Sequence, residues 1–146
     1  MIIDTSAIVA ILRDEVEAPA FLRAIREARP RRLSAASYVE IGIVIDRSPD
    51  PVVRAAVDDL LRRLNIRIEP VTPEQARIAR SAYASFGRTS GHPARLNFGD
   101  CFAYALAKDV GESLLFKGDD FARTDIPLVG SRAEQRRLSE LLAAYG

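Results

Sequence analysis

Acidic residues stand at three places in this chain where apolar elements end or begin. Asp4 ends the apolar segment MIID, and Asp119 and Asp120 follow the apolar segment SLLF. Asp100 opens the apolar helix that leads into SLLF. Sites in parallel α/β sheets form beyond the carboxyl ends of the strands. If this helix runs antiparallel to the strands, Asp4, Asp100 and Asp119 are expected to converge on one rim.

Glu40 is the carboxylate without an obvious structural role. It lies within ASYVEIGIVIDR, a segment predicted to form a buried helix, and no lysine or arginine stands three or four residues away. A buried carboxylate needs a partner or a cation. The other residues each have a structural alternative: Asp4 as a helix N-cap, Asp100 beside a helix N-terminus, and Asp119 in a turn.

Four carboxylates in one pocket repel one another unless a cation joins them. At about 4 Å and an effective dielectric constant of about 20, each pair costs roughly 4 kcal/mol. The chain has one histidine and one cysteine, so the ligands would be carboxylate oxygens, which favour Mg²⁺ or Mn²⁺ over zinc. Such ions assist phosphoryl transfer, so these residues indicate a phosphodiester or phosphomonoester substrate.

The elements that must position these residues are predicted from the apolar pattern. Short strands are expected at MIID, RRLSA, IRIEPV, SLLF and IPLV, with helices between them. Asp50 is expected to cap one of these helices, and Asn97 to cap the helix of Asp100. This alternation predicts an α/β protein with a parallel sheet covered by helices on both faces.

Composition narrows the class of protein. The chain has 146 residues, 48% of them hydrophobic, as expected for one globular domain with its own core. Its net charge of +1 provides no bulk attraction for nucleic acid, although local basic clusters could act. A single cysteine allows no internal disulfide, and neither a secretory signal nor a membrane-spanning stretch is present, so we expect a cytoplasmic protein.

Four segments occur in a fixed order along the chain: MIIDTSAIVAIL, SAASYVEIGIVI, LNFGDCFAYALAK and LLFKGDDFARTDI. Together they resemble the PIN-domain ribonucleases, specifically the VapC-type toxins of bacterial toxin–antitoxin modules. The resemblance implies a PIN-like three-layer α/β/α sandwich with a central, mainly parallel sheet. Residues 1–130 would form this PIN domain, and residues 131–146 a C-terminal amphipathic helix that packs on the domain or on a partner.

The resemblance also implies the site residues of a metal-dependent endoribonuclease. Asp4, Glu40 and Asp100 match the family's first three acidic positions, and Asp4 and Asp100 would hold the Mg²⁺ ion, for which Mn²⁺ can substitute. The fourth position falls in KGDDF, where Asp119, nearer the strand end, is preferred to Asp120. Ser6 is expected to orient a carboxylate or a water molecule.

The family implies its partners as well. These are a structured RNA substrate such as tRNA or ribosomal RNA, a VapB-type antitoxin whose tail covers the acidic groove, and a second copy in a homodimer or a higher assembly. The competing hypothesis is a non-catalytic PIN-like module that binds RNA or protein through a degenerate metal site. The retained Asp4, Glu40, Asp100 and Asp119 argue against it.

Basic residues surround these acidic segments. Arg88, His92 and Arg95 lie in the loop before Asp100, and Lys117 precedes Asp119. They either contact RNA phosphates or form a solvated loop, and the sequence leaves both open. The lone cysteine, Cys101, is predicted to be a small buried residue rather than a nucleophile.

Overall fold

A four-stranded parallel sheet organises the protein, whose structure is a computed structural model that describes residues 1–129. The strands are β1 (Ile2–Ile3), β2 (Arg32–Ser34), β3 (Arg67–Glu69) and β4 (Leu114–Leu115), in the spatial order β3-β2-β1-β4. The strand predicted at IPLV is reduced to a single bridge between Leu128 and Leu114. The helix predicted at 131–146 lies outside the described residues.

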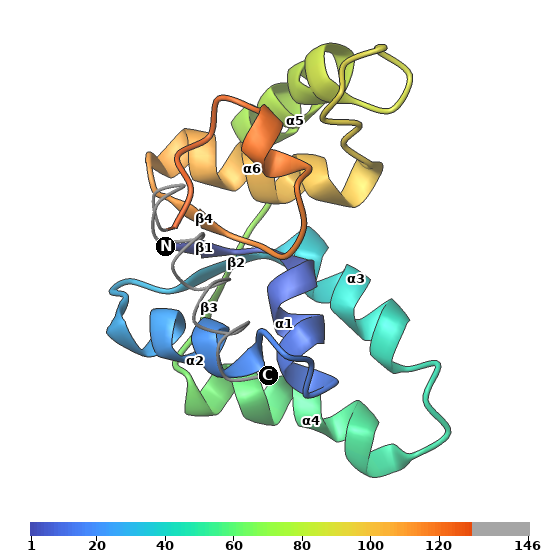
Figure 1. Cartoon of the computed structure of the whole chain (residues 1–146), viewed down its shortest axis with the longest axis vertical. Helices are drawn as coiled ribbons and strands as arrows, with labels where there is room; N and C mark the ends of the chain where they lie inside the picture. Colours follow the sequence, from blue (N-terminus) through green and yellow to red (C-terminus); the bar gives the residue numbers. More distant parts are fainter. Residues whose placement is uncertain (130–146) are drawn as a thin grey trace.

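Helices cover both faces of this sheet, as Figure 1 shows. One face carries α1 (Thr5–Leu12), α2 (Ala18–Glu27), α3 (Ala35–Ile45) and α4 (Pro51–Arg63). The other carries α5 (Pro73–Phe86) and α6 (Phe98–Val110), and the short 3-10 helix η1 (Phe121–Arg123) follows β4. Among residues 1–129, no helix combines the length and the apolar composition that crossing a membrane requires.

The strands separate two hydrophobic cores. Ile2 and Leu114 face the core under α5 and α6, whereas their neighbours Ile3 and Leu115 face the core under α1 to α4. Successive side chains of a strand point to opposite faces of the sheet, so two adjacent apolar residues bury themselves in two layers. The three-layer α/β/α arrangement predicted from the sequence is therefore confirmed.

Helix α3 departs from the prediction that it is a mostly buried helix. Ile41 and Ile45 are buried against the core, but Val39 and Ile43 are 58% and 57% exposed. One stripe of α3 packs against the core, while the outward side keeps its apolar residues in contact with solvent. Part of the apolar composition of this helix therefore lies outside the core.

Candidate active site

Asp4 lies at the carboxyl end of β1, where the chain turns into α1. Its backbone N–H donates to the Leu115 carbonyl at 2.9 Å, and its Oδ2 accepts the Ser6 backbone N–H at 2.9 Å as the N-cap of α1. The residue is 4% exposed. Burial raises the pKa of Asp4 from 3.8 to about 6; hydrogen bonds from Ser6 oppose this shift, and the charge of Glu40 adds to it.

Ser6 connects Asp4 to the loop that follows β4. Its backbone N–H donates to Asp4 Oδ2 at 2.9 Å, and its Oγ accepts the Lys117 backbone N–H at 2.9 Å. These contacts agree with the prediction that Ser6 orients a carboxylate, which stays a prediction. The serine thereby holds the segment leading to Asp119 and Asp120 beside the end of β1.

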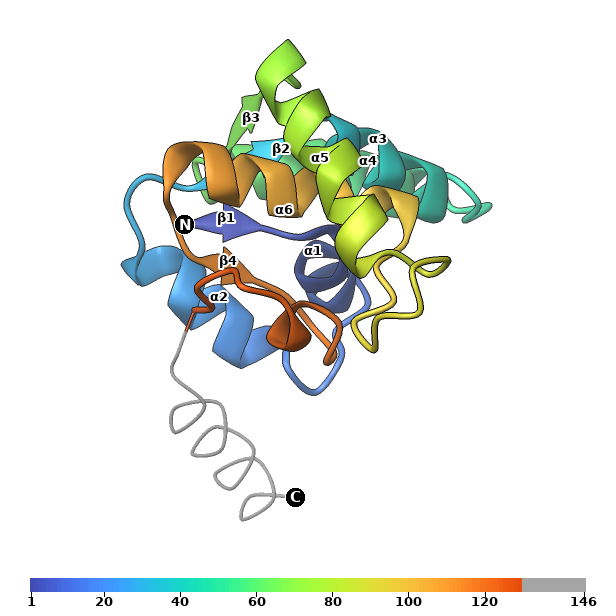
Figure 2. The same cartoon turned by 90° about the horizontal axis from the view of Figure 1, so that it is seen from above.

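Asp100 occupies the first turn of α6, which runs opposite to the strands, so its N-terminus lies at their carboxyl edge (Figure 2). Asp100 Oδ2 accepts the Asn97 N–H at 2.9 Å, and Asn97 Oδ1 accepts the Asp100 N–H at 2.8 Å. This reciprocal capping box fixes the carboxylate in one orientation. Burial, the largest cause, and the charges of Asp4, Asp120 and Glu40 together raise the pKa of Asp100 from 3.8 to about 7.

Glu40 reaches the same place from α3. It is half-buried rather than fully buried, and its carboxylate lies directly against the backbone of Gly99 in the first turn of α6. A β-carbon at Gly99 would stand 1.9 Å from Glu40 Oε2. The expectation of a buried carboxylate without a partner is therefore corrected: Glu40 is partly exposed and rests on the positive end of a helix.

The fourth carboxylate lies in the loop between β4 and η1. Asp119 and Asp120 are both exposed, and the carbonyl of Asp119 accepts the Ala122 N–H at 3.1 Å. Of the two, Asp120 is the one whose charge contributes to the raised pKa of Asp100. Electrostatic proximity to Asp100 therefore favours Asp120, whereas the sequence favoured Asp119 by its distance from the strand.

The donor set fits a hard divalent cation by its chemistry. Every candidate ligand is a carboxylate oxygen, and the raised pKa values of Asp4 and Asp100 arise partly from repulsion that a cation would relieve. Within residues 1–129, no three acidic, histidine or cysteine side chains already form a metal-binding cluster. Asp100 Oδ2 accepts a hydrogen bond from Asn97, and the Glu40 carboxylate lies against Gly99, so the two carboxylates are placed by different neighbours.

The basic residues near the site have different surroundings. Lys117 Nζ is paired with Glu15 and also lies 3.3 Å from Glu17 Oε2, so its charge ties the β4 loop to the segment between α1 and α2. His92 Nδ1 accepts the Ala94 N–H at 3.1 Å. Arg88 and Arg95 are exposed in the loop before Asp100. These two arginines remain the candidates for contacting a phosphate.

Cys101 and Phe98 flank the acidic turn of α6 with opposite exposure. Cys101 is 3% exposed, and burial together with the Asp100 charge raises the pKa of its thiol to about 11. It is a buried apolar residue, as predicted, and not a nucleophile. Phe98 is 76% exposed, with its ring edge-on to Phe102 at 4.9 Å between centroids. The sequence reasoning did not single out Phe98 or Gly99, since both belong to an otherwise apolar helix.

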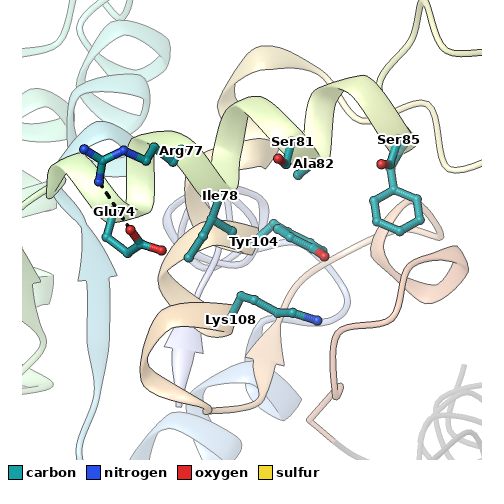
Figure 3. A pocket seen from close by; sticks show the side chains of 9 residues that line it. Glu74, Arg77, Ile78, Ser81, Ala82, Ser85, Tyr104 and Lys108 are labelled. Atoms are coloured by element: carbon teal, nitrogen blue, oxygen red, sulfur yellow. Dashed lines mark hydrogen bonds and ion pairs between the residues drawn. The ribbon is translucent and has the colours of Figure 1, made fainter.

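Figure 3 shows a groove between α5 and α6, and none of the candidate metal ligands is among the residues that line it. Ile78, Phe86 and Tyr104 contribute to its wall. Its charged residues are already paired: Arg77 with Glu74 at 3.3 Å, and Lys108 with Asp125 at 2.7 Å. Within the described part of the chain, the groove therefore adds no unpaired charge beside the acidic rim formed by Asp4, Glu40, Asp100 and Asp120.

Comparison with known proteins identifies close relatives. Residues 1–127 match the family model described as PIN domain. The chain is 58% identical over 137 residues to Ribonuclease VapC28 of Mycobacterium tuberculosis, covering 94% of this chain and 100% of that protein. Ribonuclease VapC42 of the same species is 49% identical over 126 residues, covering 86% of this chain and 96% of that protein.

Two solved structures share the fold at low sequence identity. The first is that of M. tuberculosis VapC20, described as a Sarcin-Ricin loop cleaving toxin, with a TM-score of 0.70 and 17% identity over 88% of this chain and 97% of that chain. The second is a toxin–antitoxin complex from Klebsiella pneumoniae, with a TM-score of 0.67 and 17% identity over 88% of this chain and 95% of that chain. Both support the same arrangement of sheet and helices.

Proposed function

The chain belongs to the PIN-domain family as a VapC-type ribonuclease, a toxin of toxin–antitoxin systems, and we propose that it hydrolyses structured RNA with the help of Mg²⁺. The observation that carries this proposal is the meeting of Asp4 and Asp100. They come from the end of β1 and the start of α6, and each has a pKa raised by burial and by neighbouring acidic charge. A divalent cation is the simplest group that stabilises two such carboxylates in their ionised form.

The carboxylates have distinct parts in the proposed site. Asp4 and Asp100 hold the ion because hydrogen bonds at two helix N-termini fix their orientation. When bound, the ion supplies a positive charge that polarises the phosphodiester and favours ionisation of a water molecule. Glu40 completes the pocket and orients the attacking water. Asp120, or Asp119 as the sequence suggested, supplies the fourth carboxylate. Ser6 keeps Asp4 aligned.

The proposed substrate is a structured cellular RNA, either tRNA or ribosomal RNA. The VapC20 toxin, which has the same fold, is described as cleaving the sarcin–ricin loop, an RNA element of this kind. Arg88 and Arg95 lie exposed in the loop that leads into Asp100, so a backbone phosphate near the carboxylates would meet positive charge. These contacts position the RNA without reading its sequence.

The proposed protein partners are a VapB-type antitoxin and a second copy of the chain. The toxin–antitoxin complex from Klebsiella supports the first by its fold. For the second, the outward side of α3, the helix that also carries Glu40, exposes Val39 and Ile43, one helical turn apart. Burying these side chains in a homodimer would remove apolar surface from water.

The test is cleavage of purified tRNA and ribosomal RNA by the protein freed of antitoxin. With Mg²⁺ or Mn²⁺ we expect discrete new 5′ ends, and with EDTA we expect none. Re-addition of Mg²⁺ after the chelator should restore cleavage, which controls for loss of the fold. Cleavage that persists unchanged in EDTA would overturn the metal-dependent mechanism.

A further inference from the structure

Gly99 is a helical glycine without a backbone reason to be glycine. It stands between Phe98 and Asp100 in α6, and its φ does not fall in the positive region that L side chains avoid. Glycine weakens a helix relative to alanine because it loses more conformational freedom on folding. The requirement for glycine must therefore come from a neighbour.

That neighbour is the carboxylate of Glu40. A β-carbon at position 99 would lie 1.9 Å from Oε2, 2.6 Å from Cδ and 2.9 Å from Oε1 of Glu40. All three distances are far shorter than a van der Waals contact, so the whole carboxylate rests where the side chain of any other residue would begin. The close approach of Glu40 to α6 therefore depends on the absence of a side chain at Gly99.

Gly42, on α3 itself, provides the contrast within the same chain. A β-carbon there would meet Asp46 Oδ2 at 3.8 Å, which is an ordinary contact. Gly42 and Gly99 are both helical, yet alanine fits at only one of them without displacing a carboxylate. The constraint at Gly99 is therefore specific to the acidic rim.

We propose that Gly99 is a positioning residue that seats the Glu40 carboxylate on the first turn of α6, and thereby sets the distance between Glu40 and Asp100 at which a divalent cation binds. The inference rests on the proposed function, since it assigns Glu40 to the ion-binding pocket. Gly99 touches neither the ion nor the RNA in this role. It acts only through the place it leaves for Glu40.

The methyl group of alanine should move Glu40 rather than unfold the chain. The atoms in the way are the far end of a long, partly exposed side chain with three rotatable bonds, so the carboxylate swings outward while α6 keeps its capping box. Gly99→Ala is therefore expected to fold with a thermal midpoint no lower than that of the wild type. Its defect should appear in ion binding.

The measurement is Mn²⁺ binding to the metal-free full chain, followed by electron paramagnetic resonance or calorimetry, which needs no RNA and no turnover. Gly99→Ala should weaken Mn²⁺ binding by about tenfold or more, the size typical for loss of a group that orients a ligand. Gly42→Ala is the matched control and should bind as the wild type does. Equal Mn²⁺ affinity in Gly99→Ala and the wild type would overturn the inference.

A double-mutant cycle separates positioning from any other effect of the methyl group. Once Glu40 is truncated in Glu40→Ala, adding Gly99→Ala should change the Mn²⁺ affinity no further. An additional loss in the double variant would overturn the positioning role. If the wild type itself binds no Mn²⁺, the proposed metal-dependent function fails first, so the two failures are distinguishable.

Discussion

Two pairs of carboxylates meet at the acidic rim, and they are held in different ways. Asp4 is the N-cap of α1 and Asp100 lies in the first turn of α6, and hydrogen bonds from backbone N–H groups fix both side chains. Glu40 and Asp120 arrive from the middle of α3 and from an exposed loop. The first pair is rigid and carries raised pKa values, whereas the second pair depends on packing and loop position. We infer that the rigid pair places the ion and that the second pair adjusts to it.

Removing one member of the rigid pair should have the largest effect. Asp100→Asn keeps an acceptor for the Asn97 N–H, so α6 should stay capped while the charge is lost. RNA cleavage should fall at least about 100-fold, more than for loss of an orienting group. Asp109→Asn, near the other end of α6, is the control and should cleave normally. Full activity of Asp100→Asn would remove Asp100 from the site.

Substitution of a member of the second pair should cause a smaller loss of activity together with a gain in stability. Glu40→Gln should reduce cleavage about tenfold, because the ion keeps its two rigid ligands. In EDTA at pH 8 the same change should raise the thermal midpoint by about 3 °C, because it removes a charge that opposes ionisation of Asp4 and Asp100. A large fall in the midpoint would instead assign Glu40 a structural role.

The rigid pair also predicts how stability depends on pH without metal. The folded state raises the pKa of Asp4 to about 6 and of Asp100 to about 7 from 3.8, so it binds more protons than the unfolded chain between these values. The free energy of unfolding should therefore fall as pH rises from about 4 to about 7, on the order of 3 kcal/mol from Asp4 alone. Urea unfolding in EDTA across this range measures the slope.

The control for this slope is Asp4→Asn, which should flatten the pH dependence and, because the charge of Asp4 contributes to the raised pKa of Asp100, should also move the upper end of the pH window down. Mg²⁺ should stabilise the protein more at pH 8 than at pH 5, because protons compete with the ion for the same oxygens. A pH-independent free energy of unfolding in EDTA would contradict the raised pKa values.

The smallest expected difference lies within the loop pair. Asp120→Asn should lower cleavage several-fold more than Asp119→Asn, because Asp120 is the residue whose charge reaches Asp100. Both side chains are exposed, so Asp119→Asn should leave the thermal midpoint unchanged, whereas Asp120→Asn should raise it slightly in EDTA because it removes a charge that raises the pKa of Asp100. The reverse order of activities would restore Asp119 as the fourth carboxylate, the residue that the sequence favoured.

Much of the fold was predictable because it depends on local patterns. The capping by Asp50 and Asn97 was expected from residue type and is present in the structure, and Asp4 caps α1, a role that the sequence suggested only as a structural alternative. The alternation of short apolar strands with helices correctly indicated a parallel sheet. The prediction of a strand at IPLV was wrong except for one bridge at Leu128. Strand formation depends on pairing with a neighbouring strand, which the sequence of the segment alone does not show.

The acidic rim was predictable only in part. The burial of Asp4 followed from its place after an apolar strand, but the surroundings of Glu40 did not follow from its apolar neighbours. Apolar residues lie on nearly every side of α3, so the sequence does not show which side packs against the core. Val39 and Ile43 were therefore expected to be buried. Gly99 gave no signal, because a single glycine near a helix start has several ordinary explanations.

The sequence by itself determined the carboxylates, their type of ligand chemistry and the helix ends that fix two of them, because capping hydrogen bonds join residues at most three positions apart. Only the tertiary structure decided which carboxylates meet. The sheet order brings the ends of β1 and β4 side by side, and α3 crosses to α6 at the one turn where Gly99 leaves room for Glu40. Such contacts join residues far apart in the chain, so they arise from packing of the whole domain.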